Sequence, residues 1–330
     1  MIPETKQATV KKALEATFGV SEPEDVKELV AGLTSALVYR IVVKGKPYLL
    51  RIITRDDVVA DRVRQYTCMK TAAEAGIAPR VLYINVEDKI TITDFVEAQP
   101  FPIHEARNKL PEALHRLHAL PPFPKLPDYF DTIDIFMERF KDAKILPEIW
   151  TRDIFHEYAR LALVYPRNDQ DWVSCHNDLK PENMLYDGER PWLVDWEAAF
   201  LNDRYADLAV VANFVVTNED DETDYLRRYF RGKATEYQRA RFFLMSQAVH
   251  MFYFTVFMIF GSEAKPIDID MMKPDFRNFH DRMWTGQVNL ASNETKLQYA
   301  WAHFLQMLNE VRTPRFEESL RIVSAKSAPK

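Results

Sequence analysis

A block of polar residues enclosed by short apolar runs is the feature that most constrains this chain. It is "WVSCHNDLKPENMLYDGERPWLVDWEAAF", residues 172–200, in which "WVSC", "MLYD" and "WLVD" are typical of short strands. The loop between them carries His176, Asp178 and Asn183, and Asp195 follows the last run. A fold that buries these strands must hold two carboxylates and an amide at their ends.

These three side chains suit the chemistry of phosphoryl transfer. Magnesium prefers oxygen ligands and keeps several waters, so Asn183 and Asp195 could hold it together with nucleotide phosphates. Asp178 would then be free to accept the proton of an attacking hydroxyl. Positioning and charge neutralisation supply most of the catalysis in such reactions.

The bulk composition excludes some classes of protein. The chain has 330 residues, 47% of them hydrophobic, which is enough for a large core or two packed lobes. A net charge of −6 without a basic stripe argues against nucleic-acid binding. Two cysteines cannot form a disulfide framework, and the N-terminus is typical of an amphipathic helix rather than a signal peptide. We therefore expect a cytoplasmic protein.

One apolar segment is long enough to cross a membrane. Residues 242–261, "FFLMSQAVHMFYFTVFMIFG", carry no formal charge. Ser246, Gln247, His250 and Thr255 would each need a polar partner inside a bilayer. The sequence therefore favours a buried core helix over a membrane span, and no membrane insertion is expected.

The pattern along the chain predicts two lobes. Residues 1–97 contain a first helix, five short β-branched and aromatic runs, and a helical segment that is inserted among these runs and ends at Gly76. After a proline-rich stretch, most segments from about residue 108 onward have helical periodicity. We expect a small β-rich N-lobe, residues 1–97, and a larger, mainly helical C-lobe, residues 98–330. Ligands usually bind in a cleft between such lobes.

At this point a family resemblance is recognisable. "HNDLKPENML" followed by "LVDWEAA" resembles the catalytic segment of the aminoglycoside phosphotransferase and choline kinase family, which has an α+β, protein-kinase-like fold. The continuation "DWEAAFLNDRYADLA" is most similar to bacterial choline kinases of the lipopolysaccharide-modification type. "AGLTSALVYRIVVKGKPYLLRI" and "AGIAPRVLY" resemble the strands and the end of the helix in the first lobe.

The resemblance implies roles for matching residues. Asp178 would be the catalytic base, Asn183 and Asp195 the magnesium ligands, and Arg51 the phosphate-binding residue on its strand. An arginine suits phosphate oxygens because its planar fork donates several hydrogen bonds. Nucleotide contacts would come from the turn with Thr34 and Ser35, and from the backbone of Asp94 to Val96. His176 and Asp207 would hold the catalytic loop rather than react.

The sequence departs from the family pattern at two places. The first-lobe helix usually supplies a glutamate that pairs with the basic strand residue, but Gln65 stands there, and Asp61 is the alternative partner. Choline kinases typically enclose the quaternary ammonium with two tryptophans by cation–π contact. His250 and Tyr253 occupy these positions here.

Several other polar residues have competing interpretations. One interpretation of Glu197 and Asp203 is that they face a cationic acceptor. The other is that they only solvate a loop. His115 and His118 have a spacing that can bind zinc, but without a nearby third ligand they more simply mark one helix face. Cys175 ends an apolar strand, so a small buried residue is expected there rather than a nucleophile.

Together these observations predict an ATP- and Mg²⁺-dependent small-molecule kinase. The preferred acceptor is the hydroxyl of choline or a similar amino alcohol, because acidic residues near the site suit a cation. The alternatives are an aminoglycoside, thiamine or sugar phosphotransferase, and a pseudokinase-like module that binds nucleotide without turnover. The sequence does not specify the oligomeric state.

Overall fold

The computed structural model of the protein describes residues 2–29, 36–54, 61–167, 171–267 and 274–327. Its contacts group the chain into two units, the first with residues 1–101 and 182–199, the second with residues 102–181 and 200–330. The first unit thus extends past the predicted boundary at residue 97 and also includes a segment from the middle of the chain. Thr34 and Ser35 lie outside the described residues.

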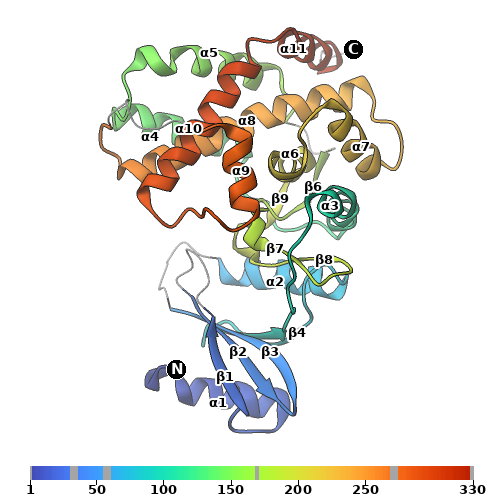
Figure 1. The fold of residues 1–330 in the computed structure, drawn as a ribbon, viewed down its shortest axis with the longest axis vertical. Helices are drawn as coiled ribbons and strands as arrows, with labels where there is room; N and C mark the ends of the chain where they lie inside the picture. Colours follow the sequence, from blue (N-terminus) through green and yellow to red (C-terminus); the bar gives the residue numbers. More distant parts are fainter. Residues whose placement is uncertain (1, 30–35, 55–60, 168–170, 268–273, 328–330) are drawn as a thin grey trace. The chain divides into compact units, whose positions relative to one another are not determined.

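The first unit is built on a five-stranded antiparallel sheet (Figure 1), in the order β1-β2-β3-β5-β4. The prediction of five strands with one inserted helix is confirmed. Its elements in chain order are α1 (Glu4–Phe18), β1 (Asp25–Leu29), β2 (Ala36–Val43), β3 (Lys46–Ile53), α2 (Arg62–Glu74), β4 (Val81–Asn85), β5 (Ile90–Asp94), β7 (Met184–Tyr186) and β8 (Pro191–Leu193).

Alternation along β3 determines which way Arg51 points. Leu50 and Ile52 lie in one buried apolar cluster with Val10 and Leu14 of α1. Because successive side chains of a strand point to opposite faces, Arg51 lies on the face of the sheet that α1 does not cover. The apolar pattern of the strand therefore leaves this guanidinium on the other side of the sheet, available for polar contacts.

The hairpin of β7 and β8 is fastened to the first unit by backbone hydrogen bonds. Leu193 N donates to Ile77 O over 3.0 Å, and Gln99 N donates to Tyr186 O over 2.7 Å. The ring of Tyr186 also stacks on Phe101, with 4.3 Å between centroids. These contacts explain why residues 182–199 group with the N-terminal part of the chain.

The second unit is mainly helical and contains one short antiparallel strand pair, β6 with β9. Its elements in chain order are α3 (Ile103–His118), α4 (Tyr129–Asp142), α5 (Glu148–Val164), β6 (Trp172–Cys175), β9 (Phe200–Asp203), α6 (Arg204–Val215), α7 (Glu219–Phe230), α8 (Glu236–Ser262), α9 (Phe276–Trp284), α10 (Asn293–Glu310) and α11 (Pro314–Ser327).

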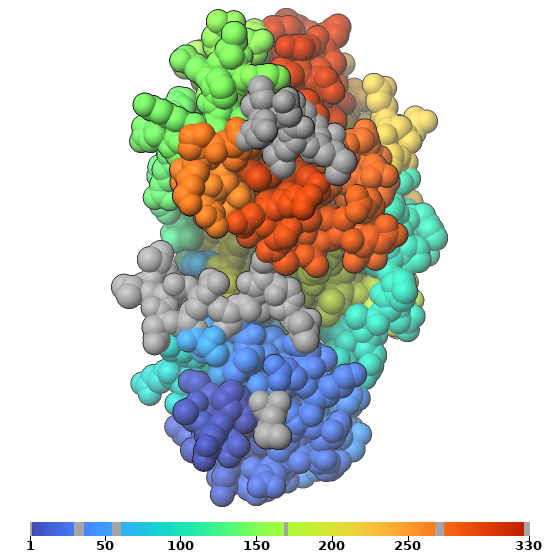
Figure 2. Space-filling view, turned by 60° about the vertical axis from the view of Figure 1, so that its left-hand side comes forward, coloured from blue at the N-terminus to red at the C-terminus, as the bar shows by residue number. Residues whose placement is uncertain are grey.

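Helix α8 forms the centre of the second unit. Among the described residues it is the one helix that is long and apolar enough to cross a membrane, yet 72% of its most apolar window is buried within the protein. It packs against α10, α11, α6 and α4. Segments after α8, orange-red to red in Figure 2, are exposed on the face shown, together with green segments from earlier in the chain. The structure therefore supports the core-helix interpretation of residues 242–261.

Three buried histidines meet where α8, α9 and α10 pack together. The Nδ1 atoms of His250 and His303 are 2.8 Å apart, and the ring centroids of His280 and His303 are 5.2 Å apart. Burial lowers the pKa of His250 and of His280 to about 3, and that of His303 well below its ordinary value. All three imidazoles are therefore neutral in the folded protein at ordinary pH.

This cluster predicts a loss of stability in mild acid. An unfolded histidine binds a proton below about pH 6.5, whereas the folded imidazole of His280 does not until about pH 3. Stability should therefore be complete above pH 6.5 and fall as the pH decreases from there. For His280 alone the loss between pH 8 and pH 5 is about 2 kcal/mol. The loss should be smaller by about this amount in His280→Gln. Urea unfolding of wild type and of His280→Gln at both pH values measures the difference.

The exposed His156 supplies the matched control, since His156→Gln should keep the wild-type slope. Glu310, whose pKa burial raises, acts in the opposite direction but is present in all three proteins, so it cancels in the comparison. If the free energy of unfolding changes by the same amount between pH 8 and pH 5 in wild type and in His280→Gln, the prediction is wrong.

Candidate active site

Asn183 and Asp195 are brought together by the β7–β8 hairpin. Met184 pairs with Leu193 in its ladder, and Val194 N donates to Asn183 O over 3.0 Å. The two predicted ligand residues thus flank the same end of one hairpin. Asn183 is buried, and the Asp195 side chain is 16% exposed. An amide oxygen and a carboxylate are donors that magnesium accepts, so this pair fits the ion that the resemblance implies.

Arg51 binds the carboxylate of Asp195. Its Nη1 donates to Asp195 Oδ1 over 3.0 Å, and its Nη2 donates to Glu197 Oε1 over 2.6 Å. Burial alone would lower the pKa of Arg51, but the charges of Asp195 and Glu197 raise it above its ordinary value. The strand residue and the predicted metal ligand therefore form one charged cluster within the first unit.

Helix α2 holds the backbone of the segment that follows Asp195. Arg64 Nη2 donates to Glu197 O over 2.8 Å, and Arg64 Nη1 donates to Ala199 O. Asp61, an alternative partner for Arg51 in the sequence, instead caps α2 by accepting from Arg64 N over 2.9 Å. Gln65 is buried. Among the described contacts, the carboxylates bound to Arg51 are those of Asp195 and Glu197.

In the second unit, a buried carboxylate holds the loop that carries Asp178. Asp207 Oδ2 accepts from His176 N over 2.9 Å, and Asp207 Oδ1 accepts from Asn177 N over 2.7 Å. These are the two residues immediately before Asp178. Lys180 Nζ lies 2.8 Å from Asp178 Oδ2, and the Asp178 side chain is 34% exposed. The loop backbone is thus fixed while the Asp178 carboxylate stays accessible.

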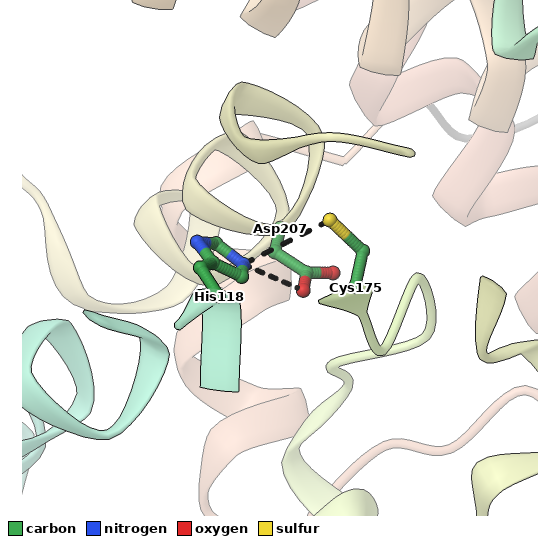
Figure 3. Close-up of side chains that lie close together, drawn as sticks. All are labelled: His118, Cys175 and Asp207. Atoms are coloured by element: carbon green, nitrogen blue, oxygen red, sulfur yellow. Dashed lines mark hydrogen bonds and ion pairs between the residues drawn. The ribbon is translucent and has the colours of Figure 1, made fainter. Parts of the chain in front are cut away.

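His118 supports Asp207 from α3 (Figure 3), with its Nε2 3.1 Å from Asp207 Oδ2. On its other side, His118 Nδ1 lies 2.7 Å from the Tyr229 hydroxyl. Since a carboxylate only accepts, His118 Nε2 carries the proton and Tyr229 donates to Nδ1. The sequence interpretation of His118 as part of a simple helix face missed this contact.

Opposing effects determine the ionisation of this buried group. Burial by itself would raise the pKa of Asp207, but the hydrogen bonds from His118 and from the loop backbone hold it below its ordinary value. Cys175 lies beside the pair, and burial raises the pKa of its thiol well above the usual range. Asp207 is therefore ionised and Cys175 is an unreactive thiol, as the sequence suggested for Cys175.

Two acidic residues considered for a cationic acceptor have other partners. Glu197 binds Arg51, as described above. Asp203 caps α6 by accepting from Tyr205 N and also binds the buried Arg241. Burial raises the pKa of Asp203 to about 6, although the charge of Arg241 opposes this shift. Asp203 thus serves the core of the second unit.

Of the two residues that replace the expected tryptophans, Tyr253 has a hydroxyl whose pKa is affected by the charge of Asp178. Burial, followed by the charges of Tyr299, Tyr129 and Asp178, raises the pKa of its hydroxyl. Its ring lies beside Phe257 and His303, with centroid separations of 5.9 and 4.9 Å. His250 instead contacts His303 inside the core, as described above.

The segment predicted to meet the adenine lines a hollow of about 450 Å³ in the first unit. Asp94, Phe95 and Val96 contribute to its wall together with Tyr48 and Trp192. The carboxylate of Asp94 forms two hydrogen bonds of 3.1 Å with Arg80. This leaves backbone groups, rather than the Asp94 side chain, as the means by which the segment would contact a base.

Comparison with protein families identifies the chain. The model described as the phosphotransferase enzyme family matches residues 25–243, which is 219 of the 330 residues. The chain belongs to this family. The match includes Arg51, the loop that carries Asp178, and the β7–β8 hairpin.

Known relatives support the same assignment. The protein LicA of Haemophilus influenzae is 34% identical over 68 residues, a match that spans 21% of this chain and 25% of LicA. A choline/ethanolamine kinase family protein of Mesorhizobium loti has a TM-score of 0.71 at 23% identity, over 96% of this chain and 99% of that one.

More distant structures share the fold. The choline kinase LicA of Streptococcus pneumoniae has a TM-score of 0.59 at 16% identity, over 98% of this chain and all of that one. Spectinomycin phosphotransferase, solved with ADP and spectinomycin, has a TM-score of 0.59 at 12% identity, over 89% and 98%. The predicted α+β, protein-kinase-like fold is confirmed by these structures, and the family match confirms the prediction of a phosphotransferase.

The contacts of His118 predict its contribution to stability. Replacing it with phenylalanine removes one donor from the buried Asp207 carboxylate and leaves the Tyr229 hydroxyl without its acceptor. We expect a loss of roughly 1–3 kcal/mol in the free energy of unfolding. His118→Gln, whose amide can still donate to Asp207, should lose less. Urea unfolding at pH 7.5 measures both values.

The exposed His104 provides the control for this comparison, because His104→Phe should be close to wild type. A His118→Phe protein as stable as wild type would show that the His118–Asp207 contact contributes nothing to folding.

Proposed function

We propose that the protein is an ATP- and Mg²⁺-dependent kinase that phosphorylates the hydroxyl of choline or a similar amino alcohol. The observation that carries the proposal is the placement of Asn183 and Asp195 at one end of a hairpin, with Arg51 bound to Asp195. Oxygen ligands and a guanidinium are the groups that a metal-bound triphosphate requires.

Asp178 is the proposed catalytic base. In the transfer, the oxygen of the acceptor hydroxyl forms a bond to the γ-phosphorus, the bond from that phosphorus to the leaving oxygen of ADP breaks, and the hydroxyl proton passes to Asp178. The backbone on the N-terminal side of Asp178 is fixed by Asp207, and its carboxylate is oriented by Lys180. Such orientation before reaction lowers the entropic part of the barrier.

The nucleotide would be held by several groups of the first unit. Arg51 would donate to phosphate oxygens, Thr34 and Ser35 would lie near the phosphates, and backbone groups of Asp94 to Val96 would meet the adenine. Magnesium held by Asn183 and Asp195 would neutralise charge on the phosphates. Each of these residues is assigned by the resemblance, and the hairpin geometry supports the metal pair.

The choice of a cationic alcohol rests on the surroundings of Tyr253. This ring lies within electrostatic reach of Asp178 and belongs to an aromatic group that could attract a cation by cation–π contact. Neighbouring imidazoles are neutral and do not repel a positive charge. Similarity to choline and ethanolamine kinases points in the same direction.

Replacement of Asp178 tests the proposed reaction. Labelled ATP is offered with a panel of acceptors: choline, ethanolamine, thiamine, an aminoglycoside and simple sugars. Wild type should transfer phosphate to an amino alcohol, and Asp178→Asn should lower kcat by about 10²- to 10⁴-fold, because a general base contributes about that much. Binding of ATP, measured by calorimetry, should persist in the variant.

Asp220→Asn, a change at an exposed acid of α7, should leave the rate unaltered. If phosphate is transferred preferentially to an aminoglycoside or a sugar, that compound is the acceptor in place of the amino alcohol. The protein would still be a small-molecule kinase. Magnesium-dependent ATP binding without transfer to any compound would instead establish a binding module.

The proposed metal ligands predict a dependence on magnesium. Chelation should abolish transfer, and Asn183→Leu, which keeps the side-chain size but removes the oxygen, should raise the magnesium concentration for half-maximal rate by about tenfold or more. Initial rates over a magnesium series measure the effect. If the magnesium requirement of Asn183→Leu is unchanged, Asn183 is not a metal ligand.

A further inference from the structure

We propose that Glu197 is a positioning residue for Arg51, and that it supplies the carboxylate which keeps this guanidinium oriented when Asp195 binds a metal ion. The inference deepens the proposed function and rests on it.

The first support is the geometry of the guanidinium. Arg51 uses two different nitrogens, Nη1 for Asp195 at 3.0 Å and Nη2 for Glu197 at 2.6 Å. Glu197 is the closer of the two carboxylates. With both nitrogens engaged, the plane of the guanidinium is fixed, which a single contact would not achieve.

The second support is that the backbone of Glu197 is itself held in place. Glu197 lies in the 3-10 helix Trp196–Ala198, and its carbonyl accepts from Arg64 of α2 over 2.8 Å. The neighbouring Trp196 is 1% exposed, and its Nε1 donates to Leu193 O over 3.3 Å. The carboxylate therefore extends from a fixed point toward Arg51.

The third support is the set of acids that α2 offers. The helix, "RVRQYTCMKTAAE", carries one acidic residue, Glu74, which pairs with Lys70 at its far end. Asp61 before the helix is engaged as its cap. Gln65 has no charge. Among the described residues of the helix and its cap, no carboxylate is placed to bind Arg51.

The charges in the cluster explain why a second carboxylate is needed. A divalent cation on Asp195 would compete with Arg51 for the same oxygens. Glu197 would then be the anion that still holds Arg51, at the moment when this guanidinium must face phosphate oxygens. Asp195 can bind the metal ion because Glu197 still binds Arg51.

The exposure of Glu197 separates this role from folding. Its side chain is 54% exposed, and an ion pair so accessible to water contributes little to stability. Glu197→Gln should therefore fold as well as wild type, with an unchanged melting temperature. We expect it to lower kcat/KM for ATP by about tenfold to a hundredfold, the usual effect of losing such an orienting partner. The KM for the acceptor should not change.

A double-mutant cycle with Arg51→Met tests whether the two residues act together. If Glu197 acts through Arg51, the double variant should be no worse than Arg51→Met alone. Multiplied losses in the double variant would show that Glu197 acts by another route and would overturn the inference. Glu74→Gln, on the surface of α2, is the matched control and should equal wild type.

Two failures of the test can be told apart. Wild-type transfer with an unaffected Glu197→Gln overturns the inference and leaves the proposed function intact. If wild type transfers phosphate to no acceptor, the proposed function fails, and the Kd for MgATP decides the inference instead. Glu197→Gln should then bind MgATP about tenfold more weakly, and an unchanged Kd overturns the role of Glu197.

Discussion

The pairing of β7 with β8 is the constraint on which the candidate site depends. Asn183 and Asp195 are separated by a whole hairpin in sequence, but the ladder bond between Val194 N and Asn183 O brings their backbones into contact. The positions of the two backbones are therefore fixed relative to each other by a backbone hydrogen bond. Because Leu193 also bonds to Ile77, the hairpin carries both donors as part of the first unit.

Buried charge serves a comparable purpose in the second unit. Asp207 is fully buried, and an ionised carboxylate in such a place is costly unless donors surround it. Here the donors include the backbone of the loop that carries Asp178, so the requirement to satisfy Asp207 is also a requirement that this loop adopt one conformation. His118 and Tyr229 extend the network across α3 and α7. Packing of three helices thus determines the backbone just before Asp178.

The sequence predicts the parts of this structure that depend on local pattern. Alternation in β2 and β3, the capping glycine after α2, and the short step from Asp178 to Asn183 all concern residues close in sequence. The contacts of His118 with Asp207 and of Glu197 with Arg51 were not predicted, because these partners are distant in sequence. His118 lies 89 residues from Asp207, and Arg51 lies 146 residues from Glu197. Periodicity shows which face of a helix is buried, but not which polar group it meets there.

Helix α8 shows how one segment can satisfy core packing and still carry polar residues. Residues 242–261 carry no formal charge, which suggests a membrane span, but a helix packed on several sides also needs apolar residues all round. One of its polar residues, His250, lies opposite His303. Burial keeps these imidazoles neutral, so the aromatic group around Tyr253 has no adjacent positive charge from them. In the proposed function, the apolar packing that suppresses protonation of the histidines is also what makes this region compatible with a cationic alcohol.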